Sequence, residues 1–167
     1  MNFGEYWPVF LQLIREPFQH TESIWGIVPL YFSWVLNELT SSKASYTTAI
    51  NTGFSFIWAS AHWAYQYSLL FESKNQNPIQ LLLALNAVVT LLVFGIGCIA
   101  LVSGLRRKYP RFCKFLGHSR FSCYFMIAIF PIQSNYLHWT WDRLIAIGIF
   151  GIPLWFLLHF GLMPVRR

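Results

Sequence analysis

The chain has 167 residues, of which 56% are hydrophobic, 19% are aromatic and only 11% are charged. Soluble globular domains carry about 25% charged residues, so this composition argues against a water-soluble fold and for a polytopic membrane protein. The net charge of +6 does not indicate nucleic-acid binding, because half of the twelve basic residues lie in one short connection between apolar segments.

Amphipathic or apolar segments fill almost the whole chain. Residues 1–22 place Trp7, Phe10, Leu13 and Phe18 along one helical side and predict an interfacial amphipathic helix. Membrane spans are then expected over residues 23–39, 46–71, 79–105, 121–137 and 144–163. The sequence thus predicts an all-α integral membrane protein with one membrane domain over residues 1–167. We expect a compact bundle of four to five transmembrane helices with an N-terminal interfacial helix.

The first apolar segment and the basic loop decide the expected topology. Residues 23–39 are at the short limit for a span, so two alternatives stay open: they cross the membrane, or they only re-enter it on one side. Short basic loops stay in the cytoplasm, and five spans then put the N terminus outside and the C terminus inside. We therefore expect a multi-pass protein of the cell (inner) membrane.

The basic loop itself covers residues 106–120. Its side chains are the candidates for contact with lipid headgroups or an acidic partner: Arg106, Arg107, Lys108, Arg111, Lys114 and Arg120.

A stripe of polar side chains marks residues 46–71 as the central helix. This segment has no charged residue, yet a helix would bring four of its polar side chains to one face. Two more polar residues share a face of the next segment. A polar stripe is costly against lipid, so it should face protein, water or a bound group. The predicted polar intramembrane face comprises Asn51, Ser55, His62, Gln66, Asn86 and Thr90.

Three functions are compatible with this pattern. Small residues such as Gly53 and Ala64 suit helix–helix association and favour a non-catalytic, oligomerising subunit of a membrane complex. The first alternative is a homo-oligomeric channel or transporter lined by the polar face of residues 46–71. The second is a haem- or pigment-binding subunit that uses His62, with His159 as a possible second ligand.

Sequence motifs for catalysis are absent. The chain contains no HExxH, GxSxG, P-loop or paired carboxylates, and no Cys/His spacing typical of a metal site. We expect no catalytic residues and no metal ligands. The expected partners are membrane lipids and either further copies of the chain or other membrane subunits, with no nucleic acid.

A short stretch resembles a known family. Residues 116–131, LGHSRFSCYFMIAIFP, look like the start of a late helix in membrane acyltransferases of the acyltransferase-3 type. In that family a histidine commonly precedes the aromatic–proline pair, and here the position is Ile129. The catalytic regions of the family have no counterpart in this chain, so we take no activity or site residue from the resemblance.

Overall fold

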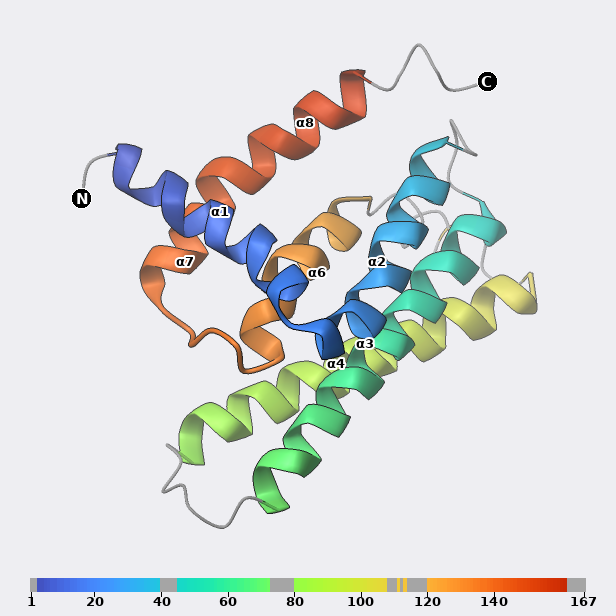
Figure 1. Cartoon of the computed structure of the whole chain (residues 1–167). Helices are drawn as coiled ribbons and strands as arrows, with labels where there is room; N and C mark the ends of the chain where they lie inside the picture. Colours follow the sequence, from blue (N-terminus) through green and yellow to red (C-terminus); the bar gives the residue numbers. More distant parts are fainter. Residues whose placement is uncertain are drawn as a thin grey trace.

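A computed structural model describes residues 3–39, 45–72, 80–107, 111, 113 and 120–161 of the chain (Figure 1). The helices are α1 (Phe3–Gln19), α2 (Thr21–Leu39), α3 (Tyr46–Glu72), α4 (Gln80–Leu105), α6 (Arg120–Gln133), α7 (Trp141–Ala146), the π-helix η1 (Ile147–Gly151) and α8 (Ile152–Gly161). No described residue lies in a β-strand, so the prediction of an all-α fold is confirmed.

Two helical segments are long and apolar enough to cross a membrane. Among the described residues these are Ala84–Leu105 and Trp141–Leu158, with mean hydropathies of 2.5 and 1.6. They support association with a membrane, whereas α2 and α3 are not among the segments that pass this test. In Figure 1, α1 begins and α8 ends in the upper part of the bundle, while α3 ends and α4 begins in the lower part.

The start of α3 follows from local chemistry. The backbone N–H of Thr48 donates to the Ser45 hydroxyl at 3.4 Å, and the Ser45 N–H donates to the Thr48 hydroxyl at 2.9 Å. This reciprocal pair satisfies two donors that an open helix end leaves without partners. Helix α3 therefore begins at Tyr46, where the first residue of the predicted central span lies.

Helix α6 differs from the segment expected over residues 121–137. It ends at Gln133 and has 14 residues. At ~1.5 Å per residue it is about 21 Å long, less than the ~30 Å hydrocarbon core of a bilayer. After Gln133 the chain turns, and Asn135 adopts the left-handed conformation with φ 60°. Asparagine tolerates this conformation better than most residues, so the turn is compatible with its sequence.

Close packing of α3 on α4 organises the bundle. On α4 the buried positions 86, 90, 93, 97, 100 and 104 follow one another at alternating intervals of four and three residues, a spacing that puts all of them on one seam. A Cβ atom on Gly53 would lie 2.6 Å from the Leu101 nitrogen and 2.8 Å from the Gly97 oxygen. The two backbones therefore touch, as small residues permit. We predicted Gly53 as an association residue between subunits, but it packs within the chain.

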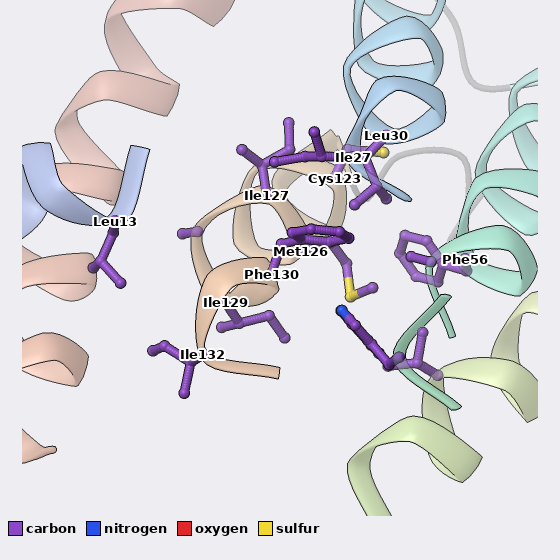
Figure 2. Close-up of a cluster of buried hydrophobic side chains, with 14 of the residues drawn as sticks. Leu13, Ile27, Leu30, Phe56, Cys123, Met126, Ile127, Ile129, Phe130 and Ile132 are labelled. Carbon is purple, nitrogen blue, oxygen red and sulfur yellow. The ribbon is translucent and has the colours of Figure 1, made fainter. Parts of the chain in front are cut away.

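The apolar core surrounds α6. Figure 2 shows α6 in the middle of the cluster, with Ile27 and Leu30 of α2 approaching it from one side and Phe56 of α3 nearby. Phe130 of α6 and Trp63 of α3 are both 0% exposed, and their ring centroids lie 5.9 Å apart. A helix too short to cross a bilayer is thus the most enclosed element of the described chain.

Helix α1 covers the bundle with part of the apolar side that the sequence predicted. Phe10 and Leu13 are buried, and α1 packs against α6 and α7. The Trp7 ring meets Phe150 of η1 edge-on at 5.1 Å. Leu11 and Phe18 stay exposed. The amphipathic helix therefore uses only part of its apolar surface against its own chain.

Candidate functional site

The C-terminal end of α6 lies inside the bundle with all of its last four carbonyl groups hydrogen-bonded. Three of these carbonyls, on residues 130–132, accept backbone N–H groups from residues 134–137 at 2.9–3.1 Å. The fourth, on Gln133, accepts the Tyr67 hydroxyl of α3 at 2.6 Å. A helix end normally leaves four carbonyls without intrahelical partners, and a buried one needs such substitutes.

Further polar side chains surround this helix end. The Tyr67 hydroxyl also lies 3.0 Å from the Gln133 side-chain oxygen. Asn86 of α4 donates from its amide nitrogen to Asn135 at 3.1 Å, and its oxygen accepts the Trp139 indole N–H at 2.6 Å. We call Tyr67, Asn86, Gln133, Asn135 and Trp139 the inner polar network. It joins α3 and α4 to the turn after α6.

The first half of the predicted polar stripe binds α2. Asn37 of α2, 1% exposed, donates to the Thr52 hydroxyl at 3.0 Å, and Asn51 donates to the Asn37 oxygen at 3.5 Å. The Ser55 hydroxyl bonds the carbonyls of Asn51 and Thr52, both at 3.0 Å. Asn51 and Ser55 are therefore engaged inside the chain, at the contact between α2 and α3.

His62 is packed between α2 and α6. Its ring stacks on Phe130 with centroids 5.5 Å apart. A Cβ atom on Gly26 would lie 2.5 Å from the His62 Cγ, so only glycine leaves room for the imidazole there. The Nε2 atom of His62 has no hydrogen-bond partner among the described residues. The side chain of His159, the other candidate ligand, lies outside the part that the structure describes.

The remaining two residues of the predicted polar face, Gln66 and Thr90, lie on different helices. Gln66 is half-buried on α3, and its amide nitrogen has no partner among the described residues. Thr90 is 7% exposed and lies on the seam between α4 and α3. The six predicted residues thus do not share one environment: Asn51 bonds Asn37 of α2, whereas Asn86 belongs to the inner polar network.

The chemistry open to this region is hydrogen bonding. The inner polar network consists of amides, a phenol and an indole, which are neutral near pH 7. Across the residues that the structure describes, no three His, Cys, Asp or Glu side chains lie together as metal ligands. Such a network can fix the packing of helices and bury polar backbone, but it offers no pair of acid and base.

The predicted basic surface is only partly described. Arg106, Arg107 and Arg111 are exposed to the surroundings of the chain. Arg107 adopts a left-handed conformation with φ 50° just after α4. Arg120 starts α6, whereas Lys108 and Lys114 lie outside the described residues. Exposed guanidinium groups remain available for the predicted contact with headgroup phosphates.

Sequence reasoning missed four of the five residues in the inner polar network, since it singled out Asn86 alone. Its partners Asn135 and Trp139 lie in a loop, and Tyr67 and Gln133 lie on segments read as spans. One sequence signal could have revealed this helix end. In the stretch PIQSN, Pro131 is followed after one isoleucine by three polar residues, Gln133 to Asn135, and this pattern indicates the end of a helix.

Comparisons of the chain with family models, with curated proteins and with solved structures find no match. The local resemblance of residues 116–131 to membrane acyltransferases is therefore not extended to the chain as a whole. Function has to be argued from the packing and the surface.

Proposed function

We propose that this chain is an integral membrane protein that acts as a non-catalytic subunit of a membrane complex, assembling with itself or with other membrane subunits. The membrane location is supported by the outer face of α4. Its apolar side chains point away from the bundle, and in water such a continuous apolar surface would be unfavourable. The exposed residues are Leu85, Val88, Leu91, Leu92, Phe94, Ile96, Ile99, Val102 and Leu105.

The observation that carries the subunit proposal is the packing of α8. Apart from His159 this helix consists of apolar residues and glycine, and its main packing partner in the chain is the adjacent η1. Leu157 is 69% exposed and Phe160 is 56% exposed. A helix that is apolar on every side belongs in contact with other helices or lipid on every side. Helix α8 therefore has surface to offer to a neighbouring protein.

Site-specific photo-crosslinking in native membranes tests this proposal. Leu157 of α8 and Leu91 of α4 are both 69% exposed, which makes them a matched pair. With a benzophenone amino acid at each position in turn, we expect protein adducts at position 157 and only lipid adducts at position 91. Lipid adducts alone at both positions would refute the subunit proposal while leaving the membrane location intact.

Thiol labelling tests the membrane location separately. In a variant without native cysteines, Arg107→Cys should react with a membrane-impermeant maleimide, whereas Leu91→Cys should not react, because lipid covers it. Reaction at both positions would contradict a membrane location for α4. Labelling of Arg107→Cys from the cytoplasmic side alone would agree with the orientation that the basic loop predicts.

The orientation of the two termini is supported unequally. The ends of α2 and α8 share the upper part of the bundle in Figure 1, which agrees with a common cytoplasmic side for their polar connections. Helix α1 begins in that same part, so its position does not support an N terminus outside. Helix α6 is shorter than a bilayer core, so it is the least supported of the five expected spans.

The channel and the cofactor subunit stay predictions with less support. The channel needs Asn51 and Ser55 to line water, but both are hydrogen-bonded inside the chain. The haem subunit needs an accessible His62 ring, but Gly26 and Phe130 hold its faces. A conductance that changes in Asn51→Leu would support the channel. A visible absorbance that is lost in His62→Ala would support the cofactor subunit.

A further inference from the structure

A cavity of about 410 Å³ is lined on one side by α8 and η1. Its other walls come from α1, α2, α6 and Leu144 of α7. The side chains that line it are aliphatic or aromatic, and their only polar atoms belong to Tyr31, Trp34 and Tyr124. None of the described residues that line it is charged. A space with such walls suits an apolar occupant.

The wall on the α8 side is built to leave room. It contains the π-helix η1, whose Gly148 and Gly151 both line the cavity. A Cβ atom on Gly148 would meet nothing within 4 Å, and one on Gly151 would meet only Ile147 at 3.7 Å. Single π-turns within α-helices occur frequently at functional sites. Here the π-turn and two glycines coincide in one wall.

The opposite wall is formed by packed aromatic rings. The Trp34 ring on α2 meets Tyr31 edge-on at 6.4 Å and Tyr124 of α6 at 5.2 Å. Edge-to-face rings at such distances are mutually stabilising. The cavity is therefore bounded by an aromatic side and a glycine-containing side.

The cavity opens onto the exposed apolar surface. Three of its lining residues, Phe125, Ile152 and Leu154, are 40%, 42% and 37% exposed and form the outer lip. Deeper lining residues are almost fully buried: Ile127 is 8% and Ala128 is 7% exposed. Whatever surrounds α8 can therefore reach Ile127 and Ala128 through the lip.

We propose that this cavity holds one acyl chain of a bilayer lipid. The inference rests on the membrane location proposed above, because a bilayer supplies such chains at the lip. The volume lies within the ~300–1,000 Å³ range of ligand pockets. A helix of a partner protein is about 10 Å thick and rises 5.4 Å per turn, so only about one turn of it would fit. A flexible hydrocarbon chain can follow the shape of a mainly apolar space of this size.

Photoaffinity labelling with a lipid tests the proposal on the whole protein. The protein is reconstituted in phosphatidylcholine vesicles that contain a phosphatidylcholine with a diazirine in the middle of one acyl chain. After irradiation, the labelled residues are mapped by mass spectrometry. We expect adducts on Ile127 or Ala128 as well as on the outer face of α4. Adducts on α4 with none on the deep lining residues would overturn the proposal, whereas no adducts on α4 would instead refute the membrane location.

Two variants and a control make the assignment specific. Gly151→Phe fills the cavity from η1, and Ala128→Leu fills it from α6. A side chain that overfills a binding site lowers the affinity for its ligand by about tenfold or more. We therefore expect the labelling of the deep lining residues Ile127 and Ala128, here called deep labelling, to fall by about tenfold in each variant. Gly95→Phe adds the same side chain to α4, where nothing lies within 4 Å of a Cβ atom, and should leave deep labelling unchanged. Unchanged deep labelling in both filling variants would overturn the assignment to this cavity.

A second probe identifies the source of the chain. Diazirine-bearing palmitic acid replaces the labelled phospholipid in otherwise identical vesicles. Deep labelling by the phospholipid supports the proposal whether or not the fatty acid also labels. Deep labelling by the free fatty acid alone would overturn the assignment to a bilayer lipid.

Discussion

Replacing glycines along the contact between α3 and α4 should destabilise the fold in a defined order. In Gly53→Ala the new Cβ would lie 2.6 Å from a backbone nitrogen, so the helices must separate by about 0.8 Å to reach an ordinary contact of 3.4 Å. A gap of about 0.5–1 Å forfeits a quarter to a half of each dispersion contact along the seam. Overpacking of this kind costs about 1–3 kcal/mol, while alanine regains about 0.5–1 kcal/mol of helix stability.

Three alanine variants test this reasoning together. Gly97→Ala would place its Cβ 3.0 Å from its nearest neighbours, and Gly95→Ala would meet nothing within 4 Å. The free energy of unfolding, measured by SDS titration in mixed micelles, should therefore fall in the order Gly95→Ala, Gly97→Ala, Gly53→Ala. Gly95→Ala should be at least as stable as the natural chain. Equal stabilities for all three variants would refute the close contact of α3 with α4.

Three further outcomes are expected. Asn86→Leu removes the acceptor of the Trp139 indole and should lower the unfolding free energy by about 1–3 kcal/mol; an unchanged value would contradict the hydrogen bond. Gly26→Ala should destabilise the chain less in a His62→Ala background than alone, with a coupling of about 0.5–3 kcal/mol in a double-mutant cycle; simple additivity would argue against their contact. Burial raises the pKa of the Cys113 thiol, so in the reduced protein its alkylation at pH 7 should be slower than that of a free cysteine and should increase with pH; an equal rate would refute its burial.

Helix positions could be predicted where the sequence carries its own stop signals. The polar residues before Tyr46 and after Glu72 end an apolar stretch abruptly, and α3 has nearly the predicted bounds. Helix α6 was expected to be longer because Tyr136 and Leu137 continue the apolar composition after Gln133. Its true end depends on Tyr67, which is distant in sequence and supplies the missing donor. The π-turn η1 was not predicted, since one extra residue in a turn leaves hydropathy unchanged.

The candidate site was predicted by residue type but not by partner. Helical periodicity correctly grouped Asn51 with Ser55 on one face, because that follows from the geometry of a single helix. It could not indicate that Asn37 of α2 would face them, nor that Trp139 would bind Asn86. Those choices depend on how helices are arranged in space. A small-residue pattern is likewise ambiguous, since Gly53 serves contact within the chain.

The early end of α6 also has a consequence for biogenesis. In the bilayer that we propose, 14 residues are too few to be integrated alone as a stable span, and without Tyr67 the carbonyl of Gln133 would have no hydrogen-bond donor. The donor that replaces water, Tyr67, is synthesised and inserted well before α6 emerges from the ribosome. Helix α2, against which α6 packs most, and α3, which supplies Tyr67, thus form a docking template for α6. Ribosomes halted before residue 120 would then leave a membrane intermediate whose central position is still empty.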